Sequence, residues 1–140
     1  MRDIETLQQI AIDFRRALED TDAIETFEGQ TFPEGCCGDA ALLLGTYLID
    51  QGHGTFDYVL GYRGDRSHAW IERNGLIIDI TADQFPDMDV PIIISTDSAW
   101  HRTFEPRVPN AANFRIYDER TVEHLDDAYG MVLEYLQREK

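Results

Sequence analysis

The sequence predicts an α+β fold in a single domain spanning residues 1–140, with two helices first, an antiparallel sheet next and a helix last. Three patterns carry this prediction. Apolar residues recur at helical spacing near both ends of the chain, alternation with period two runs through its middle, and an Asn-Gly pair separates two apolar stretches. A chain of this length with 43% hydrophobic residues can bury one ordinary core.

Helical spacing predicts two helices in the first third of the chain. The second starts near Cys37, is apolar on much of its circumference and therefore takes a central position, and it stops at Gly52, which suits a helix C-terminus. Residues 21–35 contain glycine and proline and predict a loop between the two helices. The apolar stripe of the first helix consists of Ile4, Leu7, Ile10, Ala11, Phe14 and Leu18.

Alternating and β-branched stretches predict an antiparallel sheet in the middle of the chain. Asn74-Gly75 is a strong hairpin-turn signal because both residues accept positive φ. The expected strands are "TFDYVLGYRG" (55–64), "SHAWIER" (67–73), "LIIDIT" (76–81), "VPIIIS" (90–95) and a weaker last one, "NFRIYD" (113–118). An amphipathic helix, "TVEHLDDAYGMVLEYLQREK" (121–140), closes the chain.

The charge and the missing motifs narrow the function classes. A formal net charge of −15 argues against nucleic-acid binding, which needs a basic surface, and it suits a basic protein partner. No apolar run is long enough to span a bilayer and no signal-peptide core is visible, so we expect a cytoplasmic protein without a membrane partner. No phosphate-binding glycine loop or dinucleotide fingerprint occurs, so no cofactor is expected. The oligomeric state stays open, a dimer included.

Two adjacent cysteines, Cys36 and Cys37, stand where the second helix begins. A disulfide between neighbours is strained and closes almost no loop. Two cysteines cannot form a thiolate zinc cage, and a mixed site with His68 lacks tight ligand spacing, so no metal is expected. A reactive thiol and a buried, inert thiol remain as alternatives. A helix N-terminus favours the reactive one, because its free N–H groups lower a thiol pKa.

The hairpin register places a histidine beside a carboxylate. If Asn74-Gly75 is a two-residue turn, Arg73 faces Leu76 and the numbers of opposed residues sum to 149. His68, Trp70, Asp79 and Thr81 then share one face of the sheet. His68 and Asp79 become diagonal neighbours at about 7–8 Å between backbones, which their side chains can bridge. A nucleophilic cysteine needs a base and the base an orienting group, and these two residues fit both roles.

Three stretches, "GCCGDAA", "SHAWIERNG" and "LIIDIT", resemble the motifs of the transglutaminase-like branch of the papain-like cysteine protease superfamily. The resemblance covers roughly residues 33–85, and Ile80 stands where the family often has proline. It implies a papain-like core, with N-terminal helices packed on an antiparallel sheet, and a Cys-His-Asp triad. The matching residues are Gly35, Cys37, Asp39 and Ala41 in the first motif, His68, Ala69, Trp70 and Glu72 in the second, and Asp79 and Thr81 in the third.

The Gly-x-Cys-x-Asp register favours Cys37 as the nucleophile, with His68 and Asp79 completing the triad. Cys36 is the alternative nucleophile, because Gln30 lies six residues before it, where papain-like peptidases carry their oxyanion-hole glutamine. Four further residues are candidate substrate contacts: Trp70, Gln84 and an exposed pair in a loop, Trp100 and His101.

The resemblance implies a cysteine-dependent amide hydrolase or acyl transferase, of the peptidase or of the glutamine deamidase and transglutaminase type, with a protein or peptide substrate. Its intermediate is a thioester acyl-enzyme. The second hypothesis is a protein with the same scaffold and no catalytic activity. It describes a small acidic protein-binding module, antitoxin-like or adaptor-like, and the charge of −15 suits it. The third hypothesis is a cell-wall or toxin hydrolase.

Overall fold

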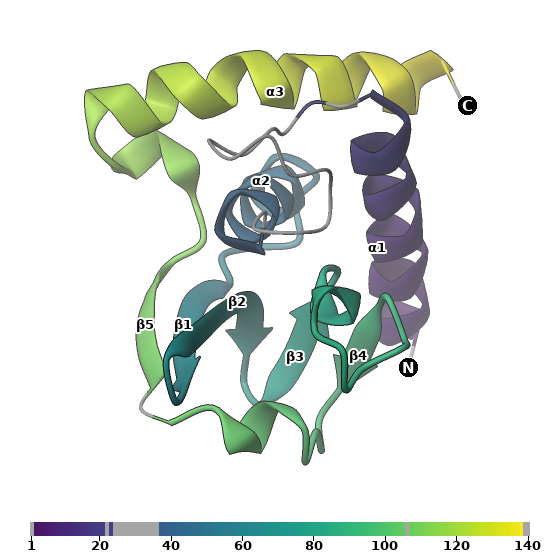
Figure 1. Ribbon diagram of the computed structural model, residues 1–140. Helices are drawn as coiled ribbons and strands as arrows, with labels where there is room; N and C mark the ends of the chain where they lie inside the picture. Colours follow the sequence, from purple (N-terminus) through teal and green to yellow (C-terminus); the bar gives the residue numbers. More distant parts are fainter. Residues whose placement is uncertain (1, 22, 24–36, 106, 139–140) are drawn as a thin grey trace.

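The computed structural model describes residues 2–21, 23, 37–105 and 107–138, and these form three α-helices and one five-stranded sheet (Figure 1). The architecture is α+β, as the sequence predicts. The helices are α1 (Arg2–Thr21), α2 (Cys37–Asp50) and α3 (Glu119–Arg138), and the strands are β1 (Asp57–Arg63), β2 (Arg66–Arg73), β3 (Leu76–Asp79), β4 (Ile93–Ser95) and β5 (Arg107–Ala111).

The sheet is antiparallel throughout, with strand order β4-β3-β2-β1-β5. Strands β1 to β4 follow one another across it, and β5 returns to pair with the outer side of β1. The turn between β2 and β3 has Asn74 at φ 52° and Gly75 at φ 84°, as a two-residue hairpin turn requires. Arg73 pairs with Leu76 and Ile71 with Ile78, so the predicted register is confirmed.

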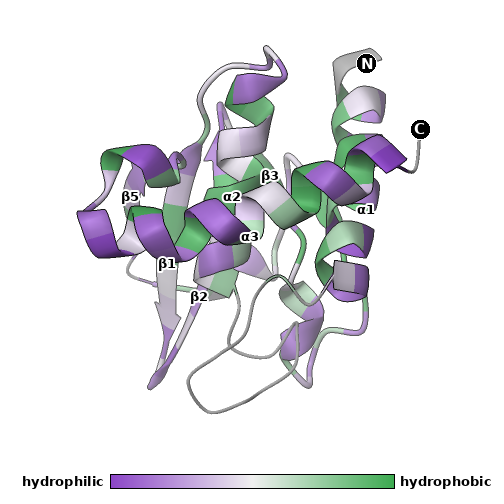
Figure 2. Cartoon of the chain, turned by 90° about the horizontal axis from the view of Figure 1, so that it is seen from above, coloured by the Kyte–Doolittle hydropathy of each residue, from purple (hydrophilic) through white to green (hydrophobic). Residues whose placement is uncertain are grey.

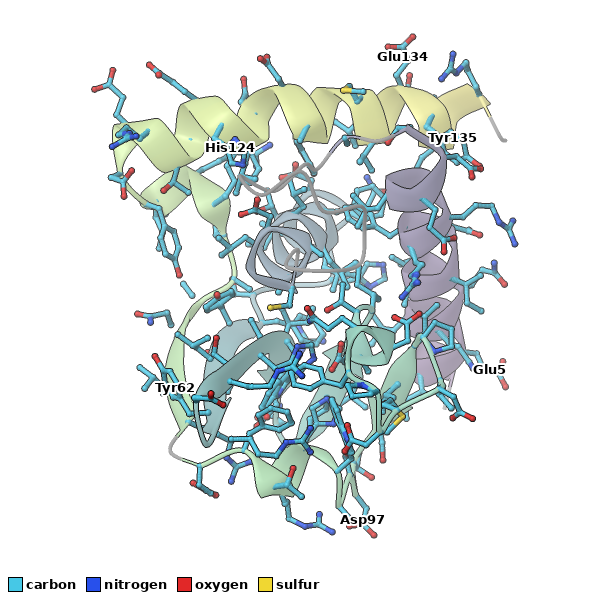
Figure 3. The ribbon with its side chains drawn as sticks, in the orientation of Figure 1. Glu5, Tyr62, Asp97, His124, Glu134 and Tyr135 are labelled. Atoms are coloured by element: carbon cyan, nitrogen blue, oxygen red, sulfur yellow. The ribbon has the colours of Figure 1, made fainter. Side chains whose placement is uncertain are left out.

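Helix α2 lies between the sheet and α3, while α1 stands beside it (Figure 1). All nine residues from Ala40 to Leu48 are buried, which confirms the central position predicted for this helix. The other two helices bury only one face each, and hydrophobic and hydrophilic residues alternate along them (Figure 2). On their outer faces, Glu5 of α1 and Glu134 of α3 point away from the body of the molecule (Figure 3).

Helix α2 ends in a glycine cap. Gly52 has φ +84°, which a residue without Cβ adopts at no steric cost. Its N–H donates to the carbonyl of Ile49 at 3.0 Å, and the N–H of His53 donates to that of Leu48 at 2.8 Å. This pair of bonds is a Schellman motif, and it satisfies the last carbonyls of the helix. The end that the sequence predicts at Gly52 is therefore confirmed.

The predicted last strand is wrong. Residues Phe114–Ile116 form a 3₁₀ turn, and Phe114 is buried among the helices, with its ring 5.5 Å from that of Tyr129. The fifth strand is Arg107–Ala111, whose first four residues are exposed and which contains Pro109. An exposed edge strand buries neither face, so no alternation of apolar residues marks it. The predicted loop 21–35 lies almost wholly outside the described residues.

Candidate active site

His68 and Asp79 meet where the pairing of β2 with β3 has ended. The last paired residues of this ladder are Ile71 and Ile78. Beyond them, Nε2 of His68 lies 2.6 Å from Oδ2 of Asp79, and both side chains are fully buried. The sequence predicts these two residues as diagonal neighbours on one face, and the distance between them confirms that proximity.

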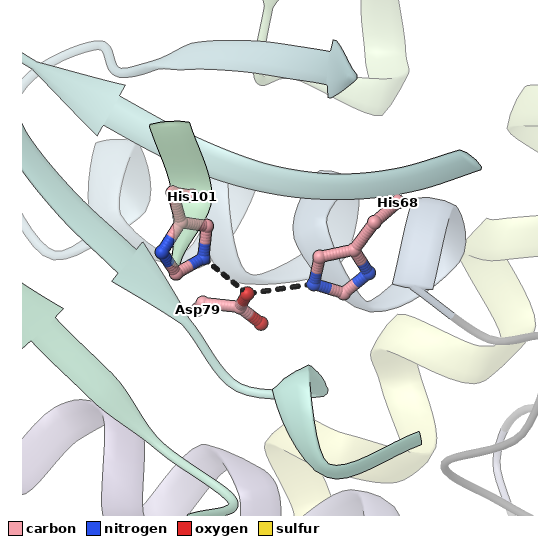
Figure 4. Close-up of side chains that lie close together, drawn as sticks. All are labelled: His68, Asp79 and His101. Atoms are coloured by element: carbon pink, nitrogen blue, oxygen red, sulfur yellow. Dashed lines mark hydrogen bonds and ion pairs between the residues drawn. The ribbon is translucent and has the colours of Figure 1, made fainter. Parts of the chain in front are cut away.

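Asp79 has three hydrogen-bond donors. Its Oδ1 accepts the backbone N–H of Thr81 at 2.9 Å. Its Oδ2 accepts from His68 and also lies 2.6 Å from Nε2 of His101 (Figure 4). Burial of the carboxyl group raises its pKa, but the positive charge of His68 and the hydrogen bonds from the two imidazoles outweigh burial and lower the pKa to about 2. Asp79 is therefore a buried carboxylate at neutral pH.

Cys37 is the first residue of α2, and its thiol interacts electrostatically with the side chains of His68 and Gln84 and with the backbone of Ala69. Burial raises the pKa of this thiol. Hydrogen bonding to His68 and the charge of His68 lower it more, so the net shift is downward. The first turn of α2 also favours an anion, through its free N–H groups. The site therefore stabilises a thiolate at Cys37.

His68 connects the thiol with the carboxylate. Burial of the imidazole lowers its pKa. The charge of Asp79 and the hydrogen bond to it have the opposite and larger effect, and the pKa rises to about 9. Because Asp79 occupies Nε2, the nitrogen that exchanges a proton with Cys37 is Nδ1, which accepts from the amide of Gln84 when His68 is neutral. The thiol pKa moves down while the imidazole pKa moves up. Both shifts favour a thiolate–imidazolium pair.

Gln84 comes from the 3₁₀ turn Ala82–Gln84 that follows β3. Its Nε2 lies 2.9 Å from Nδ1 of His68. Helix α1 anchors this turn, because Arg15 bonds both carboxylate oxygens of Asp83, at 2.7 and 2.9 Å, and the carbonyl of Ile80 at 2.8 Å. A planar guanidinium that bonds a carboxylate with two nitrogens fixes its geometry firmly. A residue on the first helix thus holds the turn that presents Gln84 to the site.

An aromatic cluster, made of Trp70, Phe85, Trp100 and Phe104, surrounds the imidazole of His68. The four ring centroids lie 5.0–5.7 Å from that of His68. Gly61 pairs with His68 on the neighbouring strand β1, and a Cβ there would lie 2.8 Å from Phe104 and 2.9 Å from Trp70. Because Gly61 has no side chain, the rings of Phe104 and Trp70 can pack against its backbone. Aromatic rings exclude water here, which strengthens electrostatic interactions inside the site.

The structure changes the expected role of two candidate substrate contacts. The sequence predicts an exposed Trp100–His101 pair, but His101 has 0% exposure and lies behind Asp79. Trp70 has 1% exposure and packs within the aromatic cluster. Neither can touch a substrate in this arrangement. Trp100 and Gln84 are partly exposed and stay available for contact. Gln30 and Cys36 lie outside the described residues.

The ligand atoms of His68, Asp79 and His101 all lie within 4.8 Å of one another, which invites comparison with a metal site. Zinc–ligand bonds are about 2.0–2.2 Å, and the ion must lie between the ligand atoms. Here each Nε2 lies 2.6 Å from Oδ2 of Asp79, a hydrogen-bond distance that places a proton between the two atoms. With Thr81 on the other oxygen, the carboxylate is fully engaged without an ion. The three residues therefore fit a hydrogen-bonded group and not a metal centre.

Comparisons of the chain with models of protein families, with curated proteins and with solved structures give no match. The likeness to transglutaminase-like enzymes rests on the motifs quoted above. Function is therefore argued from the chemistry of the site. Among the helices that the structure describes, none combines the length and apolarity needed to cross a bilayer.

Proposed function

We propose that the protein is a cysteine-dependent amide hydrolase or acyl transferase that forms a thioester on Cys37. The observation that carries this proposal is the 2.6 Å contact between the buried His68 and Asp79, together with Cys37 at the start of α2, where the charge of His68 lowers the thiol pKa. A nucleophile, a base and a group that orients the base are the three parts that covalent catalysis of acyl transfer requires. The resemblance to transglutaminase-like enzymes assigns the same three residues.

In the first half of the reaction, the Cys37 thiolate attacks the carbonyl carbon of the substrate amide and a C–S bond forms. The carbonyl oxygen becomes an oxyanion, and a donor must stabilise it. The amide of Gln84 helps to lower the pKa of the Cys37 thiol and is a suitable donor. The C–N bond then breaks, and Nδ1 of His68 gives its proton to the leaving amine. A thioester on Cys37 and a neutral His68 result.

In the second half, His68 takes a proton at Nδ1 from the acceptor that attacks the thioester. Water as the acceptor gives a carboxylic acid, as in a peptidase or a glutamine deamidase, and an amine gives a new amide, as in a transglutaminase. The C–S bond breaks, and the thiolate–imidazolium pair is restored. Hydrolysis is the more economical assignment, because no motif for a second substrate is visible in the sequence. A protein or peptide, preferably basic, is the substrate class that the net charge of −15 favours.

The experiment that tests the proposal is iodoacetamide alkylation of Cys37 as a function of pH, read by mass spectrometry. Since only the thiolate reacts, the rate should stay high below the ordinary thiol pKa of about 8.5 and fall as pH drops through the lowered pKa of Cys37. Cys37→Ser should abolish the fast reaction. His68→Ala should raise the thiol pKa, so that Cys37 reacts rapidly only at alkaline pH. His53→Ala, which removes an imidazole elsewhere, is the control and should leave the profile unchanged.

Turnover adds an alkaline limit. The leaving amine needs a proton from His68, so kcat/KM for an amide substrate should fall as pH rises through about 9, the raised pKa of this residue. The contribution of charged His68 to the free energy of unfolding also decreases as pH rises. It is fully present below the unfolded value of 6.5 and is lost as pH rises through about 9.

The alternative is a non-catalytic acidic binding module, and the net charge of −15 is the observation that suits it. Slow alkylation at alkaline pH only, with no effect of His68→Ala, would contradict the catalytic proposal and support this module. A panel of peptide amides and glutamine-containing peptides, with the acyl-enzyme trapped for mass spectrometry, then separates hydrolysis from transfer to an added amine.

A further inference from the structure

His101 is a second imidazole on the same carboxylate oxygen that orients His68. Its Nε2 lies 2.6 Å from Oδ2 of Asp79, and the close-up shows Asp79 between the two rings (Figure 4). His101 comes from the 3₁₀ turn His101–Thr103, more than twenty residues after Asp79, and its side chain has no exposure. The proposed chemistry described so far leaves this buried polar group without a role.

Asp79 and Ser98 together determine which nitrogen of His101 carries the proton. Its Oγ accepts the backbone N–H of His101 at 3.2 Å and lies 2.5 Å from Nδ1 of the same residue. The Asp79 carboxylate can only accept, so Nε2 of His101 carries a hydrogen, and the Ser98 hydroxyl holds this tautomer by donating to Nδ1. Nε2–H then donates to Asp79. The network is Ser98 to His101 to Asp79, with each donor matched by one acceptor.

This second donor fixes the carboxylate in place. With Thr81 on Oδ1 and two imidazoles on Oδ2, Asp79 cannot rotate about its terminal torsion without losing a hydrogen bond in a buried site. The ring of His101 is itself held edge-on against Trp70, with centroids 4.7 Å apart, and against Trp100, with centroids 4.9 Å apart. A fixed carboxylate fixes the plane of the His68 ring and so the direction of its Nδ1.

From this geometry we infer that His101, with its tautomer held by Ser98, is a positioning residue that acts through Asp79 on the His68–Cys37 pair. The inference rests on the proposed function and extends the three-residue assignment to a line of five: Ser98, His101, Asp79, His68 and Cys37. His101 does not touch the substrate. Its N–H also takes part of the charge of Asp79, so that the carboxylate orients the imidazolium of His68 without taking its proton.

The test compares two substitutions at one position. His101→Leu fills a similar volume without an N–H, and His101→Gln keeps an N–H close to the position of Nε2. We expect His101→Leu to slow alkylation of Cys37 at neutral pH by about tenfold, similar to the loss when a hydrogen bond that orients a metal-ligating histidine is removed, and to move the acid limb of the rate profile to higher pH. His101→Gln should restore both. Ser98→Ala should give a smaller shift in the same direction.

Phe114→Leu is the matched control, since it disturbs a buried aromatic contact, with Tyr129, on the helical face and away from Asp79. A merely structural role of His101 would make His101→Leu, His101→Gln and Phe114→Leu alike in their rate profiles. If His101→Leu does not fold, Ser98→Ala and His101→Gln carry the comparison. An unchanged acid limb in Ser98→Ala and His101→Leu, with a reactive natural protein, overturns the inference and leaves the proposed function standing. A natural protein whose Cys37 is not activated overturns both.

Discussion

The two faces of the sheet are packed by different means. Residues Ala69, Ile71 and Ile78 point toward the helices and belong to the large apolar core that α1, α2 and α3 share with the sheet. Their neighbours along the strands, Trp70 and Ile77, point to the opposite face, as alternation requires. No α-helix of the described residues packs on that second face. The connections after β3 and β4 cover it, with Phe85 and Phe104 as anchors.

The second face carries most of the buried polar chemistry. His68, Asp79, Ser98 and His101 are all buried there or at its margin, and each has a hydrogen-bond partner. On the helical face, the core cluster of the described residues is apolar apart from side chains such as Thr46, which donates to the carbonyl of Leu42. The comparison teaches that helix packing supplies the stability, while strands β2 and β3 carry His68 and Asp79 and the turns packed on them carry the residues that hold these two side chains.

The largest expected effect on stability comes from the helical face. Phe14 has no exposed surface and packs with its ring 5.3 Å from that of Tyr47. Phe14→Ala should lower the free energy of unfolding by about 3–5 kcal/mol, through lost burial and the cavity it leaves. Urea denaturation measures this change. The alkylation rate of Cys37 in the folded fraction should stay the same, and a changed pH profile would contradict the division between the two faces.

Arg15 tests the link between helix α1 and the turn that carries Gln84. Arg15→Gln should cost at least about 1.5–3 kcal/mol, because it removes charged hydrogen bonds to Asp83 and to a buried carbonyl. The turn that carries Gln84 should loosen, so alkylation of Cys37 should slow as well.

The control for Arg15 is Arg102→Gln, which breaks an ion pair with Asp97 whose side chains are 56% and 85% exposed. Exposed pairs contribute about 0–1 kcal/mol, so stability and reactivity should barely change. Equal effects of the two substitutions in urea denaturation would show that the contact of Arg15 with Asp83 is no stronger than a surface pair.

The smallest expected effect concerns packing behind His68. Gly61→Ala places a Cβ 2.8 Å from Phe104 and 2.9 Å from Trp70, so we expect a loss of about 1–3 kcal/mol from overpacking. The displaced rings should also shift the pH profile of Cys37. Gly130→Ala is the matched control, because no atom lies within 4 Å of its added Cβ and it sits in helix α3. Thermal denaturation should show a gain of up to about 1 kcal/mol there.

Local signals predict the scaffold well, because they depend on neighbours in the sequence. Helical periodicity predicts all three helices, and the turn Asn74-Gly75 sets the parity that brings His68 toward Asp79. These features need no knowledge of distant contacts. The papain-like assignment and the triad's activity stay predictions, which the proposed experiments test.

Contacts made by loops could not be predicted in the same way. His101 contacts Asp79 from an irregular segment whose sequence has no periodic pattern. The aromatic residues near it in the sequence are equally consistent with an exposed patch. The contact of Gln84 with His68 depends on a 3₁₀ turn that Arg15 holds from another helix. Strand β5 could not be predicted because it is an exposed edge strand, and its sequence has no alternation of apolar residues.

That edge strand has a consequence for how the molecule meets its own copies. An open sheet edge offers N–H and C=O groups that can pair with a strand of another chain and seed aggregation. In β5, Pro109 lacks an N–H and Arg107 adds a charge, and at the other edge β4 has only three residues. Both edges are therefore poor templates. Replacing Pro109 by a β-branched residue would remove this protection at high concentration without touching the chemistry.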